Sequence, residues 1–432
     1  MNVFYVFLMS LVTRLMYLGL TYTPESYRML SDDKAYMELA LNMVSHGPMV
    51  FNTTELSPTA SVIGPGIGWL LMPVVSIFGQ NWPAVFIYTA VISSFIPVFV
   101  YLIAKRIYDK RIAVLAAFWS ILYILFLKYT LTAGKDLWMT LLLLTCTYLI
   151  VRQIEKEGHG IQIVMLSITY AMLIHLDERF LIIGPVFFAF LLFLRGKNLK
   201  AKLEKSFLFV GMVFVLMIPW LMRNYHVHDK IVLISLRTAK YTDKLFGYDQ
   251  VENFPSHERR WYISTSDIEA IKDNNVTSTI ENELDEQQVD AIKNGVLPHK
   301  FNYFETCLAS FINFWEPIDI SYGYYHTGYR FDGKWSLKHN LSVAIFYGVM
   351  LVFSILGFPL LFKKQKHLTL LILIVIVSYS FLHIFVIPFT TYRYRIPLDP
   401  YIIIAGCYGL VFFFNSLFTR FFKTGGKIKT NL

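Results

Sequence analysis

Charged residues and cysteines are both scarce in this sequence. Asp, Glu, Lys and Arg make up 16% of the 432 residues, whereas about a quarter is usual in a soluble globular protein. The 3 cysteines form no CxxC pair, and Cys146 and Cys407 lie inside apolar runs, which argues against a disulfide framework and a structural zinc site. The sequence also lacks internal repeats and a glycine-rich nucleotide-binding loop. The low charge content excludes an ordinary soluble domain.

Apolar residues fill most of the chain instead. Hydrophobic residues make up 55% and aromatic residues 17% of the sequence, and the mean hydropathy is +0.49. Many apolar runs approach the roughly 17–25 residues that a helix needs to cross a bilayer, so we predict an all-α polytopic membrane protein. The net charge of +9 comes from short basic clusters between these runs. No basic domain is large enough to hold a nucleic-acid duplex.

The basic clusters predict the side of the membrane on which each loop lies, because cytoplasmic loops are enriched in Lys and Arg. These clusters lie at 105–111, 195–205 and 363–367 and in the tail after Phe418. The first apolar segment lacks a basic leader and a cleavage site, so we interpret it as a retained helix and not as a signal peptide. We expect both termini in the cytoplasm and ten crossings, at residues 3–22, 84–104, 112–128, 137–151, 161–176, 180–194, 206–222, 341–362, 368–389 and 398–418.

One further apolar stretch, residues 61–79, is not expected to cross the membrane. It contains Pro65, Pro73 and four glycines, and a crossing here would place the cluster at 105–111 on the outer side. A broken helix that faces lipid would also leave backbone groups unsatisfied. We therefore expect this stretch to lie at the outer interface or to dip into it.

The predicted topology divides the chain into three parts. Residues 1–235 form a transmembrane module whose first outer loop is 23–83, residues 236–340 form a polar outer loop that caps the site, and residues 341–432 form the last helices and a basic cytoplasmic tail. Charged residues at the ends of several helices then share the outer face. We expect them to converge on one polar site.

Asp32 and Asp33 open the first outer loop. Because adjacent carboxylates repel each other, one of the two is suited to accept a proton. Tyr36 lies one helical turn after Asp32 and faces the same way. The alternative is a solvated helix start, where acidic residues are favoured by the helix dipole.

Two further outer turns carry candidate residues. Lys135 is a natural partner for a phosphate, and Asp136 at a helix start could orient an acceptor or a metal. The alternative for this pair is an interfacial anchor with a helix cap. Arg179 is expected to face the site, whereas Asp177 and Glu178 are interpreted as polar residues that keep the turn hydrated.

Two later runs add arginines on the outer side. Arg223 follows a proline and a tryptophan at the outer boundary, and His226 and His228 would share a face on a strand but lack a third metal ligand. In the run TYRYRIPLDP, alternation in an extended segment predicts that Arg393 and Arg395 point the same way, a geometry suited to a phosphate or diphosphate. The alternative for this run is an interfacial belt of Tyr and Arg.

In their order along the chain, these motifs resemble those of the GT-C-type integral-membrane glycosyltransferases, in the branch related to protein O-mannosyltransferases and to the aminoarabinose transferases of lipid A. Two features depart from that family, since Gly64–Pro65–Gly66 stands in place of a Pro-Pro pair and ten crossings are at the low end. The matching stretches are Asp-Asp-x-x-Tyr at 32–36, the proline- and glycine-rich 61–79, TAGKDLW at 132–138, PWLMRNY at 219–225 and RYRIP at 393–397.

The resemblance implies a GT-C-like helical bundle that transfers a sugar from a polyprenyl or dolichyl phosphate to a lipid, glycan or protein acceptor. The site would face outward from the plasma (inner) membrane, and a single displacement would invert the anomeric centre. The family's catalytic acid maps onto Asp32, with Asp33 as its alternate, and its second acid maps onto Asp136. No certain cofactor is implied, and the need for a divalent metal stays open. The residues expected to bind substrate are Tyr36, Lys135, Arg179, Arg223, Arg393, Tyr394 and Arg395.

Two other classes of membrane protein use similar features. A transporter or flippase of lipid-linked sugars should place its binding residues near the bilayer midplane and show repeat symmetry, and the sequence shows neither. A polysaccharide polymerase or ligase shares the many helices, the large outer loop and the functional arginines. Such enzymes rely on the late loop, so the early Asp-Asp-x-x-Tyr pattern favours the transferase.

Overall fold

The computed structural model describes residues 2–22, 31–49, 63–154, 160–192, 198–235, 303–316, 341–386 and 392–424. Every regular element in these ranges is a helix, which confirms the all-α fold class predicted from the sequence. The elements before residue 132 are α1 (Val3–Thr21), α2 (Ser31–His46), α3 (Gly66–Phe78), α4 (Trp82–Ser93), α5 (Phe95–Ile107), α6 (Lys110–Leu122), α7 (Ile124–Lys128) and the 3₁₀ turn η2 (Tyr129–Leu131).

The remaining elements fall into two groups. The first comprises α8 (Asp136–Ile154), α9 (Gly160–Leu176), the 3₁₀ helix η3 (Glu178–Ile182), α10 (Ile183–Leu192) and α11 (Leu199–His228). The second comprises α16 (Tyr303–Trp315), the π-helix η5 (Ala344–Gly348), α19 (Val349–Lys364), α20 (Lys366–Phe381), the π-helix η6 (Leu382–Val386), the 3₁₀ helix η7 (Tyr392–Arg395) and α21 (Asp399–Thr424). Of the predicted outer loop 236–340, only the helix α16 and Glu316 lie within the described residues.

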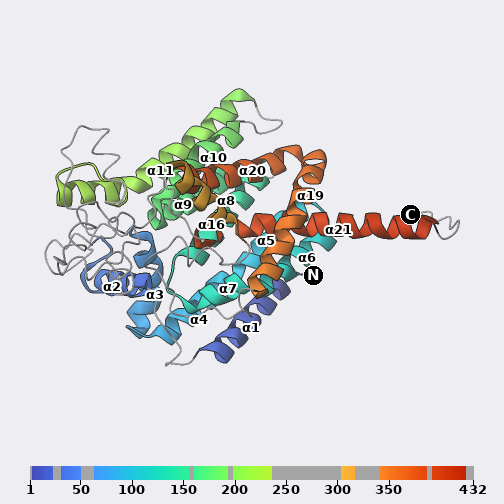
Figure 1. Ribbon diagram of the computed structural model, residues 1–432. Helices are drawn as coiled ribbons and strands as arrows, with labels where there is room; N and C mark the ends of the chain where they lie inside the picture. Colours follow the sequence, from blue (N-terminus) through green and yellow to red (C-terminus); the bar gives the residue numbers. More distant parts are fainter. Residues whose placement is uncertain are drawn as a thin grey trace, which may run out of the picture.

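The helices form one bundle with two distinct ends (Figure 1). The N-terminus and the C-terminal end of α21 lie toward the right of the view, and α2 and α3 lie at the opposite end. A chain that crosses a membrane an even number of times has both of its termini on the same side, as in this arrangement. The bundle therefore has one end that carries α2 and α3 and another that carries the N-terminus and the end of α21.

Seven helical stretches of the described residues are long and apolar enough to cross a membrane, counting α4 with α5, η5 with α19 and α20 with η6 as one stretch each. The bent pair of α6 with the helical turns that follow it, at an angle of 46°, gives up to an eighth span. Each of the ten predicted segments coincides with a helix or with consecutive helices in the described residues. The shortest of them are α9, with 17 residues, and α10, with 10 residues. A polytopic membrane protein is thereby confirmed.

Side-chain caps explain where several helices begin. Asn81, Asp109 and Asn198 each accept hydrogen bonds from backbone N–H groups in the first turn of the helix that follows, which are α4, α6 and α11. Such caps satisfy N–H groups that have no partner within the helix. Asp109 lies inside the basic cluster at 105–111, so this polar turn also separates α5 from α6.

The proline- and glycine-rich stretch forms α3, a helix of 13 residues. At about 1.5 Å per residue it is too short to cross a hydrocarbon core of roughly 30 Å. A Cβ atom on Gly64 would lie 2.3 Å from the carbonyl oxygen of His175, and one on Gly66 would lie 2.6 Å from the backbone nitrogen of Leu176. Only glycine allows this approach. The start of α3 therefore lies directly on the last residues of α9.

Two glycines bring α19 and α21 into close contact. A Cβ atom on Gly357 would lie 1.9 Å from the carbonyl oxygen of Ala405, and one on Gly409 would lie 2.0 Å from the carbonyl oxygen of Phe353. Small residues at an interface let membrane helices approach this closely. The contact fixes the position of α21, which begins directly after η7 and its turn.

We expect the Gly357→Ala variant to unfold at a temperature several degrees below that of the wild type, because overpacking a tight contact costs about 1–3 kcal/mol. Gly211→Ala in α11 is the matched control, since no heavy atom lies within 4 Å of a Cβ atom at that position. The control should keep the wild-type midpoint or raise it slightly. Thermal unfolding of the detergent-purified proteins, followed by tryptophan fluorescence, measures both changes. Equal midpoints for the two variants would contradict the close α19–α21 contact.

Candidate active site

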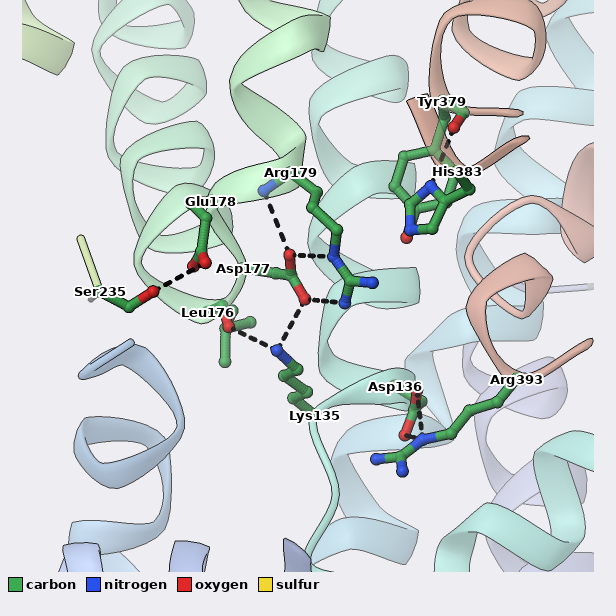
Figure 2. Close-up of polar contacts among 10 residues, drawn as sticks. All are labelled: Lys135, Asp136, Leu176, Asp177, Glu178, Arg179, Ser235, Tyr379, His383 and Arg393. Atoms are coloured by element: carbon green, nitrogen blue, oxygen red, sulfur yellow. Dashed lines mark hydrogen bonds and ion pairs between the residues drawn. The ribbon is translucent and has the colours of Figure 1, made fainter. Parts of the chain in front are cut away.

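Five charged residues meet where α8 begins, where α9 ends and where the chain approaches α21 (Figure 2). Lys135 and Asp136 stand at the start of α8, Asp177 and Arg179 lie between α9 and α10, and Arg393 belongs to η7. We call these five residues the charged cluster. All but Asp177 are candidate residues predicted from the sequence, and the structure brings them together from distant parts of the chain.

Asp177 lies at the centre of the charged cluster, and its side chain is only 2% exposed. Its Oδ2 atom accepts a hydrogen bond from Lys135 Nζ at 2.6 Å. Its Oδ1 atom accepts bonds from the backbone nitrogen and Nε of Arg179 at 3.1 and 2.6 Å, and Arg179 Nη2 also donates to Oδ2. The interpretation of Asp177 as a hydrated turn residue is therefore wrong, because two cations enclose its carboxylate.

The ionisation of Asp177 follows from opposing effects. Burial opposes the charged form, but Arg179 and Lys135 outweigh it and hold the pKa of Asp177 well below its ordinary value. Burial likewise opposes the charge of Arg179, yet Asp177 keeps the pKa of that guanidinium well above its usual range. Because the pKa of Asp177 is lower in the folded state than in the unfolded chain, the pairing stabilises the fold above about pH 4 and is lost as the pH falls through the lowered value.

Asp136 is paired with Arg393. The Nε atom of Arg393 lies 3.0 Å from Oδ2 and 3.2 Å from Oδ1 of Asp136. The carboxylate is 2% exposed and the arginine side chain 17% exposed. A Cβ atom on Gly134 would lie 3.2 Å from Oδ2 of Asp136, so the loop passes close to the pair. The predicted second acid is thus in contact with one of the predicted phosphate-binding arginines.

Asp33, from the first turn of α2, lies next to the loop that leads into α8. Asp33 is 1% exposed, and its Oδ1 atom accepts a hydrogen bond from the backbone nitrogen of Ala133 at 3.1 Å. This bond ties the first turn of α2 to the residues that precede Lys135. Tyr36 is buried one turn later, at 4% exposure. Asp32 belongs to the first turn of α2, but its side chain lies outside the described residues.

The prediction that Arg393 and Arg395 point the same way is wrong. The YRYR run forms the 3₁₀ helix η7 and not an extended segment, and residues two apart on such a helix are rotated by about 240°. Arg395 is fully buried, and its Nη1 atom donates to the carbonyl oxygens of Phe314 and Glu316 at 2.8 and 2.9 Å. It therefore holds the end of α16 against η7, whereas Arg393 turns to the charged cluster.

Arg395 also forms a buried ion pair with α21. Its Nε atom donates to Asp399 Oδ1 at 2.9 Å, and the hydroxyl of Tyr123 donates to Asp399 Oδ2 at 2.7 Å. The guanidinium carbon lies 3.5 Å from the centre of the Tyr347 ring. Arg395 thus links η7, to which it belongs, with α16, η5 and α21. Among the described residues, its hydrogen bonds and its ring contact are made to these segments and to no member of the charged cluster.

Arg223 and the two histidines near it lie on α11. The Nε atom of Arg223 donates to the carbonyl oxygen of Met49 at 3.2 Å, and its guanidinium lies 5.0 Å from the Trp220 ring centre. His226 and His228 belong to the same helix, where residues two apart do not share a face, so the strand interpretation is wrong. In the part of the chain that the structure describes, no three His, Cys, Asp or Glu residues are placed to hold a metal ion.

An aromatic group borders the charged cluster on the side of α20. The guanidinium of Arg179 lies 4.3 Å from the ring centre of Tyr394. The ring centre of His383 lies 5.4 Å from that of Tyr394 and 4.3 Å from that of Tyr379. The His383 Nε2 atom and the Tyr379 hydroxyl are buried and have no hydrogen-bond partner in the described structure. Such atoms point to a water or a ligand. Neither Tyr379 nor His383 was predicted from the sequence, although a Tyr and a His four residues apart inside an apolar run are a usable signal.

One family model matches part of the sequence. Residues 62–222 match the model described as dolichyl-phosphate-mannose-protein mannosyltransferase. The match includes four members of the charged cluster and leaves out the first-loop acids and η7. No curated protein sequence is significantly similar to the chain.

Solved structures match over almost the entire chain. The oligosaccharyltransferase of Archaeoglobus fulgidus in the apo form is 13% identical with a TM-score of 0.59, over 100% of this chain and 52% of that one. The fold is that of the GT-C membrane glycosyltransferases. The oligosaccharyltransferase AglB from Archaeoglobus fulgidus, in complex with an inhibitory peptide and a dolichol-phosphate, matches with a TM-score of 0.56 and 14% identity, over 99% of this chain and 52% of that one.

The GT-C resemblance predicted from the sequence is thereby confirmed. The chain spans about half the length of these archaeal proteins, at 52% of each. ArnT from Cupriavidus metallidurans in the apo state overlaps less well, with a TM-score of 0.42 and 11% identity over 94% of this chain and 77% of ArnT. At 13% and 14% identity, the likeness to the two archaeal structures establishes the fold alone.

We expect Arg395→Met to destabilise the protein strongly, because it leaves the buried Asp399 carboxylate without its cation, a loss of about 3–5 kcal/mol. The double variant Arg395→Met/Asp399→Leu removes both charges and should recover most of that stability. Thermal unfolding and the yield of monodisperse protein on size-exclusion chromatography measure both variants. An Arg395→Met protein as stable as the wild type would refute the structural role of this arginine.

Proposed function

We propose that this chain is a membrane glycosyltransferase that moves a sugar from a polyprenyl or dolichyl phosphate to an acceptor on the extracytoplasmic face. The observation that carries the proposal is the charged cluster, in which Lys135, Arg179 and Arg393 are held by carboxylates within a GT-C fold. The family model that matches residues 62–222, and so four of the five residues of the charged cluster, is described as a dolichyl-phosphate-mannose-protein mannosyltransferase. One similar structure also contains a dolichol-phosphate.

The three cations suit the leaving group of such a reaction. In the transfer, the bond between the anomeric carbon and a phosphate oxygen breaks, and the lipid phosphate departs with the electron pair. Negative charge grows on that oxygen, so fixed cations beside it stabilise the transition state more than the ground state. Lys135 and Arg393 come from two different outer turns, and Arg179 from a third, so the phosphate would be held from several sides.

The acceptor requires a base on the opposite side of the sugar. Asp32 takes the proton of the acceptor hydroxyl as its oxygen attacks the anomeric carbon, and this single displacement inverts the configuration there. Asp33 supports the assignment indirectly, because its bond to the Ala133 nitrogen places the start of α2 beside the loop that carries Lys135. Asp136 is the alternative acid, and donor binding would draw Arg393 away from it.

The face of the membrane follows from the charge distribution. The basic clusters at 105–111 and 363–367 belong to turns at the opposite ends of the helices from the charged cluster, and such clusters mark the cytoplasmic side. A lipid-linked donor fits an outward-facing site, because nucleotide sugars are not available outside the cytoplasm. Placement in the plasma (inner) membrane is part of the same proposal.

Two competing functions make different demands on the structure. A transporter or flippase of lipid-linked sugars should place its polar residues near the bilayer midplane, whereas the charged cluster lies at helix ends. A polysaccharide polymerase or ligase would use the outer loop 236–340 as its main site. The first-loop acid distinguishes these readings, because only the transferase requires it as the base.

The test is a transfer assay with the purified protein in nanodiscs and a panel of polyprenyl-phosphate sugars, following the release of free polyprenyl phosphate. We expect sugar-dependent release that falls by about 10²–10⁴-fold in Asp32→Asn, the range for loss of a general base. Glu38→Gln, the same charge change at an exposed position of α2, is the control and should keep wild-type rates.

Two other outcomes of this assay would indicate a different base or a different function. Release that survives Asp32→Asn would move the base to Asp33 or Asp136. Binding of the donor without any turnover, in the presence of lipid, glycan and peptide acceptors, would favour a carrier of lipid-linked sugars over a transferase.

A further inference from the structure

Asp177, which is 2% exposed, has no part in the proposed transfer chemistry. Each of its two oxygens accepts two hydrogen bonds, so the carboxylate is saturated by its own neighbours. A saturated, buried carboxylate is poorly suited to serve as a base. Its contacts instead fix the positions of the two cations beside it.

The geometry brings the two cations close together. Lys135 Nζ and Arg179 Nη2 both donate to the same oxygen of Asp177, so the two nitrogens lie within about 6 Å of each other. Two cations that approach this closely would repel each other without the carboxylate between them. The triad of two cations and one anion has a net charge of +1, so it still attracts an anion.

The donors that remain point to an additional ligand. An ammonium group has three N–H donors, and protein atoms take two from Lys135, namely Asp177 Oδ2 and the Leu176 carbonyl oxygen. Arg179 uses Nε and Nη2 on Asp177 and rests on the Tyr394 ring. The buried Tyr379 hydroxyl and His383 Nε2, both without a hydrogen-bond partner, adjoin this side of the charged cluster.

We propose that Asp177 is a positioning residue that holds the Lys135 ammonium and the Arg179 guanidinium as one paired receptor for the phosphate of the lipid-linked donor. This inference rests on the proposed function. Lysine is a flexible chain that loses considerable rotamer entropy when it is fixed, and Asp177 fixes it before the donor arrives. Pre-organised cations need no rearrangement as charge develops on the departing phosphate.

The neighbouring acid, Glu178, supplies a matched control. Its carboxylate accepts a hydrogen bond from the Ser235 hydroxyl at 2.7 Å, whereas that of Asp177 faces Lys135 and Arg179 (Figure 2). Glu178→Gln and Asp177→Asn each remove one negative charge at adjacent positions. A general electrostatic effect would appear in both variants, and loss of positioning would appear only in Asp177→Asn.

The binding experiment uses undecaprenyl phosphate without a sugar, added to the full chain in nanodiscs, with affinity taken from the concentration dependence of the thermal midpoint. We expect Asp177→Asn to weaken binding by about tenfold or more, as when a residue that orients a binding group is removed. Glu178→Gln should stay within about twofold of wild type. Because Asp177→Asn could fail to fold, Asp177→Glu is measured as well. It keeps the charge but moves the carboxylate by one methylene, and we expect at least about threefold weaker binding.

The kinetic experiment separates positioning from a loss of folded protein. A merely structural defect lowers the active fraction, so kcat falls while the KM for the donor stays constant. Loss of positioning raises the KM for the donor and lowers kcat together, because Lys135 and Arg179 would contact the phosphate in both states. In a double-mutant cycle, Lys135→Met should weaken donor binding much less in the Asp177→Asn background than in the wild type.

The outcomes distinguish this inference from the proposed function. Wild-type affinity in Asp177→Asn, or in Asp177→Glu where the first variant does not fold, overturns the positioning role and leaves the proposed transferase intact. Equal weakening in Asp177→Asn and Glu178→Gln also overturns it. A wild-type protein that neither binds undecaprenyl or dolichyl phosphate nor releases either from a sugar donor overturns the proposed function and this inference with it.

Discussion

The ion pair of Asp177 with Lys135 and Arg179 joins the start of α8 to the end of α9, and the geometry of the charged cluster depends on it. Removing three charged groups from water is expensive, and only close pairing with full hydrogen bonding offsets that cost. Asp177 meets the condition, since both of its oxygens are saturated. Loss of one partner would leave the others buried and uncompensated. The triad therefore holds the start of α8 against the end of α9 and also supplies fixed charges at the site.

Three further contacts hold α3, α2 and η7 next to this triad of charged residues. Gly64 and Gly66 let α3 rest on the backbone of His175 and Leu176, immediately before Asp177. Asp33 binds the loop backbone before Lys135, and Arg395 anchors the turn that carries Arg393 two residues earlier. Each contact is made to backbone or to a buried partner, so the site is assembled from helix ends whose positions are set by the bundle.

Much of the fold could be predicted from the sequence, because crossing a bilayer imposes long apolar runs and asymmetric basic clusters. The candidate residues at helix ends could be predicted for the same reason, since topology alone places Lys135, Arg179 and Arg393 on one face. Their individual partners could not. Asp177 and Glu178 are adjacent acids in one turn, and nothing in the sequence separates the enclosed one from the one that binds Ser235. The YRYR alternation was equally ambiguous, because strand and 3₁₀ geometry orient its arginines differently.

Arg393 and Arg395 belong to the same short helix, η7, but bind different parts of the structure. Arg395 binds carbonyl oxygens at the end of α16, the described part of the outer loop 236–340, and Asp399 in the first turn of α21. Arg393 lies two residues away on the same short helix and reaches Asp136. The short helix η7 is therefore held by α16 and α21 through the buried guanidinium of Arg395, and in that position it presents Arg393 to Asp136. The two arginines of η7 thus have separate tasks, because one anchors the helix to α16 and α21 and the other pairs with the acid at the start of α8.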